Sequence, residues 1–571
     1  AWEPKFPTRG RLFAGAKDVC QVKVFSLVLI GLMVGFFGFF LQVPFPDSVD
    51  ASFHLYFSQE FFSTFVEAGA YPDWDAASYQ GMGTPAFRFY APLAYLVSAF
   101  GQTLGFSVEN SLKMTVFLFF CVGFFGVRKW LSVLGLKEFA GHSAFLFLVA
   151  PPFAIFLFRV FFFQNLCALM FFPFILAGFE MWFGGNNRGL TIGGVFFGLA
   201  AWTHLPTTMM IGWVLFSVAM IRGILDGTFR FVFKVLAGAF LGLLFAGPYV
   251  LPAITEMGNI HFEFLEKQKP WLMKQYLDNP IENKTPETGF LASLGLQKTR
   301  RVLFWSLCVA FISAYCGFFS SILSFRNNSL ISIGIAAHFW AFMNFSHSEF
   351  LWKTIPKFEL IQYPWRWVAI VCILLIPFSA GLLKTTSKFL EKCGYLLLIV
   401  WVGMTLLVQS TSLSLSRDSL DQFLKGNFHY PCEYTPFSCK LSDCRNSNTI
   451  SSITGPYHLI QASKGAQLSI QENFRQWSKF EVQNATFSTE LFIRTHFDPF
   501  WQLRDTENSE TFPLSPFSPC GNMYAEIPAG KRTLILDRRE SPLRGLGYIL
   551  MGLSAVLLIL NYLRVSKDSS G

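Results

Sequence analysis

Ionisable side chains stand directly beside several apolar runs, where a hydrophobic protein normally has none. The first group follows the first apolar run and comprises Asp47, Asp50, His54 and Glu60. A charged group at the centre of a bilayer-spanning helix costs about 2.5–3.5 kcal/mol on insertion scales, so polar groups that gather at membrane depth usually serve binding or catalysis. Asp50 and His54 are four residues apart and share one face of a helix. These two are the candidates for acid–base chemistry.

Further polar side chains stand at later boundaries between apolar runs. They are Arg159, Gln164, Asn165, His204, Glu256, Gln362 and Arg366. The planar guanidinium group fits phosphate oxygens with two parallel hydrogen bonds, a geometry that Lys cannot reproduce. Arg159 and Arg366 are therefore the candidates for binding a phosphate group.

These candidates also have structural interpretations. Asp50 and His54 could form a local pair on one helix face, and Arg159 could extend its charge to the membrane surface along its apolar stem. His204 could bond a carbonyl at a helix end, and Glu256 could simply face water. The sequence leaves these alternatives open.

Two short sequences in the first loop resemble ligand-binding motifs. Asp73-Trp74-Asp75 has the form of a metal-binding DxD, but Tyr71-Pro72 beside it is typical of a turn. The glycines of Gly81-Met82-Gly83 do not form a phosphate-binding loop, because no strand precedes them and no Lys follows. We expect both sequences to be turns.

The composition is that of a polytopic membrane protein. Of 571 residues, 52% are hydrophobic and 14% are charged, against roughly 25% charged in an average soluble protein. Backbone groups in lipid must bond within their own segment, so the apolar runs are expected to be helices. The net charge of +9 could indicate nucleic acid, but Lys and Arg lie mainly in short loops, as topology signals do. We therefore exclude nucleic acid as a partner.

The predicted fold class is mainly α, with about a dozen transmembrane helices and a small β-rich extracytoplasmic domain before the last helix. A basic cytoplasmic arm (1–23) comes first and a transmembrane domain (24–411) follows, with its first extracytoplasmic loop at 43–108. The β-rich domain (412–542) and a final helix with a cytoplasmic tail (543–571) complete the chain. The expected spans are residues 24–42, 109–127, 139–157, 165–183, 189–204, 206–222, 233–253, 302–323, 329–345, 366–384, 393–411 and 545–563.

The short apolar segment Ala91 to Phe106 decides the sidedness of everything after it. If it does not cross the membrane, the basic loop residues gather on one side, which is then the cytoplasmic side. These residues are Lys5, Arg9, Arg11, Lys17, Arg128, Lys129, Lys137, Arg188, Arg222, Arg230, Lys234, Arg326, Lys384, Lys388, Lys392, Arg564 and Lys567. If it does cross, this pattern is lost, so we expect a juxtamembrane or re-entrant helix. The predicted location is the plasma (inner) membrane, with the N-terminus cytoplasmic and the active face extracytoplasmic.

The long hydrophilic segment near the C-terminus has the alternation of β-strands. The runs FEVQNATFSTELFIRTHF and GNMYAEIPAGKRTLILDR alternate apolar and polar residues, and Pro528, Ala529 and Gly530 form a turn signal. Four cysteines lie in the same segment: Cys432, Cys439, Cys444 and Cys520. Their spacing does not fit a zinc site, and we expect one or two disulfides in an oxidising compartment.

Several blocks of residues carry a family resemblance. They are Asp50-x-x-x-His54-Leu55, Gly69-x-Tyr71-Pro72-x-Trp74, the Gly, Pro and aromatic pattern from Tyr79 through Tyr90 to Tyr95, Ala150-Pro151 with Arg159, Thr203-His204, Pro248-Tyr249-x-Leu251-Pro252-Ala253-x-x-Glu256, Gln362-Tyr363-Pro364-Trp365-Arg366 and Phe497-Asp498-Pro499-Phe500-Trp501. The chain resembles bacterial membrane proteins labelled 6-pyruvoyl-tetrahydropterin synthase-related, over nearly its whole length. It departs from their pattern at Gln164, where we expect an acid.

The resemblance implies a GT-C-like glycosyltransferase that uses a polyprenyl-phosphate-linked sugar, with a carboxylate of the first loop at the catalytic centre. Asp50 is the expected general base of an inverting transfer to an extracytoplasmic glycan or protein acceptor, and His54 assists it. The residues expected to bind the donor phosphate or substrate are Arg159, His204, Glu256, Gln362, Arg366 and Tyr90. No cofactor is expected, and a divalent metal is an alternative that we do not favour.

A second hypothesis is a non-catalytic GT-C-like subunit or lipid-handling scaffold of a membrane complex. The loss of the acid at Gln164 and the 70 Phe residues, which could pack against partner subunits, motivate it. A transporter is less consistent with the sequence, because the polar residues gather at one face and not at the bilayer midplane.

Overall fold

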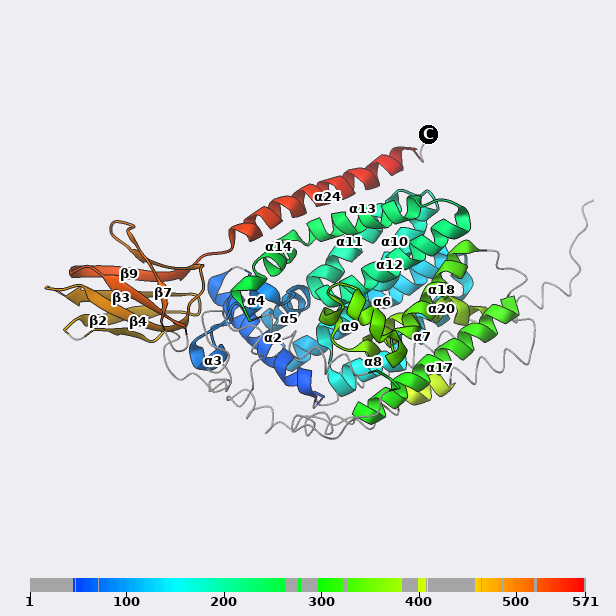
Figure 1. The fold of residues 1–571 in the computed structure, drawn as a ribbon, viewed down its shortest axis with the longest axis horizontal. Helices are drawn as coiled ribbons and strands as arrows, with labels where there is room; N and C mark the ends of the chain where they lie inside the picture. The colour runs from blue at the N-terminus through cyan, green and yellow to red at the C-terminus, as the bar shows by residue number, and fades with distance from the viewer. Residues whose placement is uncertain are drawn as a thin grey trace, which may run out of the picture.

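The chain folds into a large helical part and a β-sandwich beside it (Figure 1). The computed structural model describes residues 45–46, 48–69, 71–261, 276–278, 296–321, 327–382, 399–406, 408, 458–463, 465–484, 486–517 and 521–568. The expected arm 1–23, the first span 24–42, Asp47, and the cysteines Cys432, Cys439, Cys444 and Cys520 therefore lie outside the described residues. The last helix, α24 (Pro542–Asp568), runs from the sandwich along the helical part.

The first loop forms four helices, which stand between the sandwich and the rest of the helical part. They are α2 (Val49–Ala68), α3 (Ser78–Gly81), α4 (Ala86–Phe89) and α5 (Leu93–Thr103). The following helices are α6 (Val108–Val133), α7 (Ala140–Leu148), α8 (Pro151–Ile155), α9 (Phe163–Leu169), α10 (Phe172–Phe183), α11 (Arg188–Thr203), α12 (Leu205–Asp226), α13 (Arg230–Phe245), α14 (Gly247–Thr255), α17 (Leu296–Ser321), α18 (Asn328–Phe342), α19 (Glu349–Thr354) and α20 (Trp367–Leu382).

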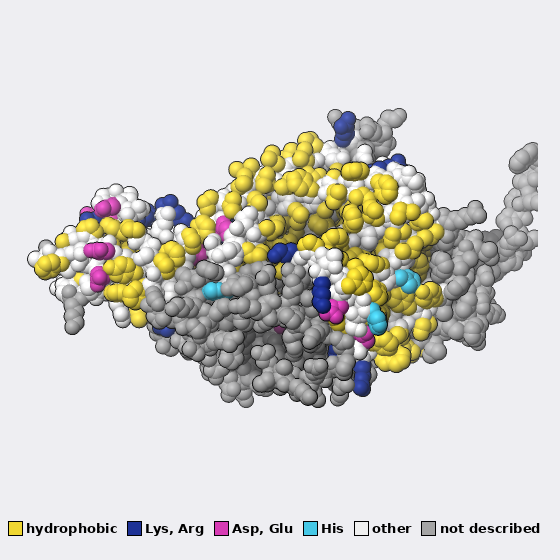
Figure 2. All heavy atoms as spheres, in the orientation of Figure 1, with side chains coloured by type: hydrophobic (Ala, Val, Ile, Leu, Met, Phe, Trp, Pro, Cys, Tyr) yellow, Lys and Arg dark blue, Asp and Glu magenta, His cyan; other side chains and the backbone are white. Residues whose placement is uncertain are grey.

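The predicted spans between residues 109 and 384 fall on these helices, but the span 233–253 covers two of them, α13 and α14. Five helices in the described part of the chain are long and apolar enough to cross a membrane, or up to seven if each bent pair is one span. This is fewer than the dozen expected: α11 and α20 have 16 residues each, and α17, where the span 302–323 was expected, is not among the helices that could cross. Run 24–42 and most of run 393–411 lie outside the described residues. Exposed apolar side chains such as Phe233 (70%), Phe240 (60%) and Ile549 (62%) cover the side where α13 and α24 lie (Figure 2).

The prediction of one continuous span over residues 233–253 is wrong. The chain bends by 92° between α13 and α14. Pro248 stands in the first turn of α14, where a missing N–H costs nothing. Gly247 meets Gly547 of α24 so closely that a Cβ added there would lie 2.9 Å from the Gly547 carbonyl oxygen. The bend therefore lays α14 against the start of α24.

Helix α5 is the described part of the segment that decided the predicted topology. Its 11 residues extend about 16 Å at 1.5 Å per residue, about half of the roughly 30 Å of hydrocarbon. It packs against α2 and α6, and Gly101 lies so close to α6 that a Cβ would meet Met114 Cε at 2.6 Å. The length of α5 agrees with a segment that does not cross; the sidedness of the protein stays a prediction.

The β-rich domain is a sandwich of two antiparallel sheets. One has the order β1-β4-β8-β7 and the other β2-β3-β9-β5-β6. The strands are β1 (Ile460–Ala462), β2 (Gln467–Asn473), β3 (Trp477–Asn484), β4 (Thr489–His496), β5 (Trp501–Asp505), β6 (Thr511–Phe512), β7 (Ser515–Phe517), β8 (Asn522–Ile527) and β9 (Gly530–Arg538). The predicted alternation is confirmed in β3, β4, β8 and β9. The turn before Gly530 carries the chain from one sheet to the other.

The first loop inserts a side chain into the core of the sandwich. Trp74 is fully buried among the sandwich residues and packs edge-on against Trp501 at 5.5 Å between ring centroids. Gly83 lies against the Trp74 ring, where a Cβ would stand 2.2 Å from Nε1, and its φ of +72° is one that glycine adopts easily. The predicted turn at Gly81-Met82-Gly83 is thus confirmed, and it makes room for Trp74.

Candidate functional site

Helix α2 positions Asp50 and His54 on successive turns. Asp50 lies in the first turn, and α2 is not among the helices that could span a membrane. His54 is 3% exposed, and its Nδ1 lies 2.6 Å from the Tyr95 hydroxyl of α5. Burial lowers the pKa of His54 to about 3, so its imidazole is neutral at physiological pH.

Asp50 has the electrostatics of an acid–base group. Burial raises the pKa of its carboxyl to about 7, and the positive charge of Arg366 opposes this shift. Among the described residues, no hydrogen bond or ion pair within 4.0 Å involves the Asp50 carboxylate. A carboxyl that exchanges its proton near neutral pH and has no fixed partner can act on a substrate.

Arg366 lies within electrostatic reach of Asp50 and ends a short 3-10 turn, Pro364–Arg366, just before α20. Its guanidinium lies over the ring of Phe162, 4.4 Å from the centroid, and Nη1 donates to the Ile361 carbonyl at 2.8 Å. Its Nε is buried with no hydrogen-bond partner among the described residues. Arg366 is thus held by aromatic packing and one hydrogen bond, and its Nε–H remains available as a donor.

His204 is held in one tautomer by the residues around it. Asn165 Nδ2 donates to Thr207 Oγ1 at 2.5 Å, so the Thr207 hydroxyl proton remains for His204 Nδ1, 2.6 Å away. The Thr207 backbone N–H also donates to Nδ1, at 3.2 Å. Because Nδ1 accepts, the proton of the neutral ring is on Nε2. His204 lies within electrostatic reach of Arg366 and His54, so it adds a second N–H donor to the site.

Two further predicted residues lie beside this group. The Tyr90 ring lies 6.4 Å from His54 and 5.6 Å from Phe53, between centroids. Gln362 has a φ of +67° in the left-handed region, a strained conformation that is uncommon for this residue type and often found at functional sites. It begins the turn that leads to Arg366. We name the set Asp50, His54, Tyr90, His204, Gln362 and Arg366 the Asp50 site.

Arg159 lies in a π-helical turn, Phe156–Val160, and is partly exposed. Such turns are rare and often occur at functional sites. The next residue, Phe161, has a φ of +55°, and its ring packs 5.8 Å from His54. The turn therefore brings this segment beside the Asp50 site, while the predicted phosphate-binding role of Arg159 remains a prediction.

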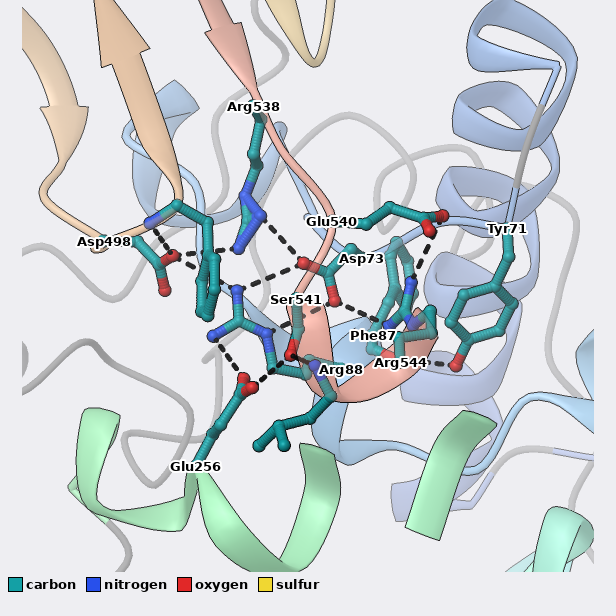
Figure 3. Close-up of polar contacts among 12 residues, drawn as sticks. Tyr71, Asp73, Phe87, Arg88, Glu256, Asp498, Arg538, Glu540, Ser541 and Arg544 are labelled. Atoms are coloured by element: carbon teal, nitrogen blue, oxygen red, sulfur yellow. Dashed lines mark hydrogen bonds and ion pairs between the residues drawn. The ribbon is translucent and has the colours of Figure 1, made fainter. Parts of the chain in front are cut away.

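Glu256 belongs to a different cluster (Figure 3). Its Oε2 lies 3.2 Å from Arg88 Nη1, and it accepts a hydrogen bond from Ser541. Arg88 also bonds Asp73 and Asp498, each at 3.1 Å. The structure therefore does not join Glu256 to Asp50 by any described contact, and the sequence-based interpretation that Glu256 faces water is wrong.

Three arginines and three acids form this buried cluster, which we call the arginine clamp. Its members are Arg88, Arg538, Arg544, Asp73, Glu256 and Asp498. Asp73 accepts from Arg538 at 2.8 Å and from Arg544 at 2.7 Å in addition to Arg88. Burial alone would raise the pKa of Asp73, but these arginines hold it well below the usual range. The charges balance, and each arginine also packs over an aromatic ring: Phe500, Trp74 or Tyr71.

The clamp explains the Asp73-Trp74-Asp75 motif. Both Asp73 carboxylate oxygens are bonded to guanidinium groups, and Asp75 accepts from the Tyr56 hydroxyl at 2.8 Å. Among the described residues, no group of three or more His, Cys, Asp and Glu side chains could hold a metal ion. Sequence reasoning missed Arg88, Asp498, Arg538 and Arg544, although charged residues inside apolar, aromatic stretches such as FRFY and HFDPFW signal buried ion pairs.

A second ion-pair group attaches the sandwich to α2 itself. Arg475 lies 3.3 Å from Glu60 and 2.7 Å from Glu67. Glu60, which the sequence placed in the first polar group, thus serves domain contact. Gln164 donates a hydrogen bond to the Ala91 carbonyl just before α5, so the residue that replaces the expected acid fixes the first loop to α9.

Comparisons with known proteins give one family and two distant structural likenesses. A family model described as the 6-pyruvoyl-tetrahydropterin synthase related domain, a membrane protein, matches residues 87–416. No curated protein matches the sequence. The chain is similar to arabinofuranosyltransferase AftD from Mycobacteria, with TM-score 0.38 and 14% identity over 66% of this chain and 28% of that chain. It is also similar to ArnT from Cupriavidus metallidurans bound to undecaprenyl phosphate, with TM-score 0.36 and 13% identity over 67% of this chain and 63% of that chain.

The chain thus spans less than two thirds of either solved protein. Both TM-scores are too low to carry an argument about mechanism. The residues of this chain, and above all the Asp50 site, must supply that argument.

Proposed function

The chain belongs to the 6-pyruvoyl-tetrahydropterin synthase-related family of membrane proteins, and we propose that it is a GT-C-like glycosyltransferase. It transfers a sugar from a polyprenyl-phosphate donor to an extracytoplasmic acceptor, with inversion at the anomeric carbon. One observation carries the proposal. The Asp50 carboxyl has a pKa of about 7 and lies within electrostatic reach of Arg366, and neither makes a direct ion pair with a described residue. A proposed base and a proposed phosphate ligand are thus close enough to influence each other while neither is bound to the other.

In the proposed reaction Asp50 takes the proton of an acceptor hydroxyl as that oxygen attacks the anomeric carbon. The bond from the anomeric carbon to the phosphate oxygen breaks, and its electron pair leaves with the lipid phosphate. A single displacement of this kind inverts the configuration. A positioned general base typically contributes about 10²–10⁴-fold to the rate.

Arg366 and His204 are the proposed ligands of the departing phosphate. Arg366 has a donor nitrogen to spare, and the tautomer of His204 directs an N–H away from Thr207. Charged hydrogen bonds from a guanidinium to phosphate are among the stronger ones in proteins. Because these donors meet the charge of a monophosphate, the proposed reaction requires no metal ion.

The remaining residues of the site have supporting roles in this proposal. His54 is neutral and fixed to Tyr95, which suits it to bonding the acceptor or orienting Asp50. Tyr90, Gln362 and Arg159 are proposed to contact the donor. Glu256 is bound within the arginine clamp, so we now assign it to domain attachment.

A non-catalytic scaffold is the second candidate. Gln164 favours it, because the acid expected there by resemblance is absent and the amide is used to hold Ala91. The two candidates differ in whether the purified protein turns over a lipid-linked sugar.

The Asp50→Asn variant tests the proposal. We expect it to lose at least 100-fold of the transfer rate, measured with radiolabelled polyprenyl-phosphoryl pentose and hexose donors in proteoliposomes. Asn keeps the shape of the side chain and removes an ionisable group from a buried place, so folding is expected to be unaffected. Thermal unfolding and detergent size-exclusion profiles check this.

Glu349→Gln is the matched control. Glu349 is 52% exposed and pairs with Lys353 on α19, so its loss is expected to leave the transfer rate unchanged. Full activity in the Asp50→Asn variant would remove Asp50 as the base. If wild-type protein shows no turnover of these donors and co-purifies with a stoichiometric partner, the scaffold is the better description.

A further inference from the structure

Three aromatic rings from three strands stand together on one face of the four-stranded sheet. They belong to Phe492 of β4, Tyr524 of β8 and Phe517 of β7. The Phe492 centroid lies 5.3 Å from that of Phe517 and 5.4 Å from that of Tyr524. The Phe517 and Tyr524 rings are 6.3 Å apart and nearly parallel, at 28°. We call these three residues the aromatic platform.

The platform is on the outer face of the sandwich. The neighbours of Phe492 on β4, Leu491 and Ile493, are buried in the core, so the alternation of a strand directs Phe492 outward. The same holds for Tyr524 between Met523 and Ala525. Phe492 and Tyr524 face each other directly across the strand pair. Such large apolar surface outside a core usually marks a binding site.

Phe517 lies at the edge of the sheet and is 49% exposed. A cross-strand aromatic pair by itself stabilises a sheet, which accounts for Phe492 and Tyr524. It does not account for Phe517, whose strand has three residues, all of them exposed. Phe517 therefore extends the platform at a position where it adds little to the core.

Polar groups surround the rings on the same face. Gln461 is opposite Phe492 on β1, and Ser515 is opposite Tyr524 on β7. Glu490 and Glu526 are paired across the next row, and Glu490 accepts a hydrogen bond from the Tyr524 hydroxyl at 3.2 Å. These groups combine hydrogen-bond donors with acceptors.

We propose that the aromatic platform binds a glycan chain. The C–H bonds on one face of a sugar ring carry partial positive charge and meet the negative face of an aromatic ring. The sugar hydroxyls at the rim then bond amides, hydroxyls and carboxylates. The nearly parallel rings of Phe517 and Tyr524 suit two adjacent sugars of one chain. Glu490 and Glu526 outnumber the single Arg494 in the outward positions of β4 and β8, and this acidic balance disfavours an anionic lipid surface.

If the aromatic platform binds a glycan, a glycan is the acceptor class of the proposed transfer. This acceptor role rests on the proposed function. The sandwich contacts α2, the helix that carries Asp50, through Arg475 and its two glutamates, and the arginine clamp fixes the first loop to it. A glycan held on the sandwich would thus be bound to a domain that directly contacts the helix carrying the proposed base. Binding itself does not require Asp50.

Glycan binding by the full chain in detergent tests this. The probes are mannan, arabinogalactan, dextran and the tetramer of N-acetylglucosamine, in affinity electrophoresis and microscale thermophoresis. We expect at least one probe to bind wild-type protein, and Phe517→Ala and Tyr524→Ala to weaken that binding at least tenfold. Phe487→Ala is the matched control, because Phe487 is 73% exposed but lies in the turn between β3 and β4.

Three outcomes overturn the inference. One is that no probe binds wild-type protein, and another is that Phe517→Ala and Tyr524→Ala bind as tightly as wild type. The third is that these variants instead lose binding to phosphatidylglycerol vesicles or lose self-association, which assigns the platform to a lipid surface or to a second copy of the chain. The Asp50→Asn variant separates the two proposals, since it is expected to keep glycan binding while it loses transfer.

Discussion

At the scale of single residues, Asp50 is partly buried and has no direct partner among the described residues. Burial raises the pKa of its carboxyl to about 7, so the group changes charge in the physiological range. The raised pKa also means that the native state binds a proton that the unfolded state has lost, between about pH 4 and pH 7. Asp50 therefore contributes less to stability as pH rises through this window.

The same pKa predicts the pH dependence of transfer. A general base works only when ionised, so we expect kcat/KM to rise about tenfold per pH unit below pH 7 and to level off above it. Initial rates between pH 5.5 and pH 8.5 with the lipid-linked donors provide the measurement. A rate that falls as pH rises through 7 would indicate a general acid and contradict this role. Arg366 opposes the shift, so Arg366→Gln is expected to move the midpoint to higher pH.

At the scale of elements, close backbone contacts decide how the helices meet. Gly247 and Gly547 bring α14 and α24 together with no side chain between them. The 92° bend before α14 is what makes this contact available. A glycine also permits a close contact in the first loop, where the absence of a Cβ at Gly83 leaves room for the Trp74 ring to enter the sandwich.

Gly547→Ala tests the contact between α14 and α24. The added Cβ would lie 2.5 Å from the Gly247 backbone, which cannot move aside as a flexible side chain would. Overpacking of this kind costs about 1–3 kcal/mol, and thermal unfolding in detergent is expected to show a lower Tm. Gly552→Ala is the control on the same helix, because nothing lies within 4 Å of a Cβ there. An equal Tm for the two variants would show that the contact is not tight.

At the scale of the whole molecule, buried charge links the sandwich, the first loop and the last helix. The arginine clamp joins residues as far apart as Asp73 and Arg544, which are 471 positions apart in sequence. Its buried arginines and buried acids are equal in number, and Arg544 also lies 3.9 Å from the half-exposed Glu540. The clamp therefore links the sandwich to the first loop and to the start of α24.

Arg88→Met tests the arginine clamp. The Arg88 side chain is completely buried, and its removal leaves three acids with two arginines. Breaking a buried ion pair by removing one partner costs about 3–5 kcal/mol, so we expect a large loss in the free energy of unfolding. Adding Glu256→Gln restores the charge balance and is expected to recover part of the loss.

Arg504→Met is the control for the clamp. Arg504 is 40% exposed and pairs with Asp537 on the sandwich surface. Exposed pairs contribute about 0–1 kcal/mol. If both arginine variants unfold at the same denaturant concentration, the clamp does not hold the domains together.

The sequence by itself determined the features that depend on local pattern. Apolar runs of membrane-spanning length marked the helices between residues 109 and 384, and alternation marked β3, β4, β8 and β9. These signals are local because a helix or strand repeats every few residues. The family resemblance also indicated Asp50, His54, His204 and Arg366 as site residues. The structure brings these four residues together.

Only the tertiary structure decided where the buried charges find their partners. The sequence gives Asp73 the form of a metal ligand in an expected turn and makes Glu256 a substrate ligand or a solvated acid, yet both are bonded to arginines from other parts of the chain. The contact between α14 and α24 was equally hidden, because Gly247 meets Gly547, a residue about 300 positions further along the chain. Which buried charge meets which partner, and which backbone meets which glycine, depend on three-dimensional packing, and no local repeat in a sequence records that.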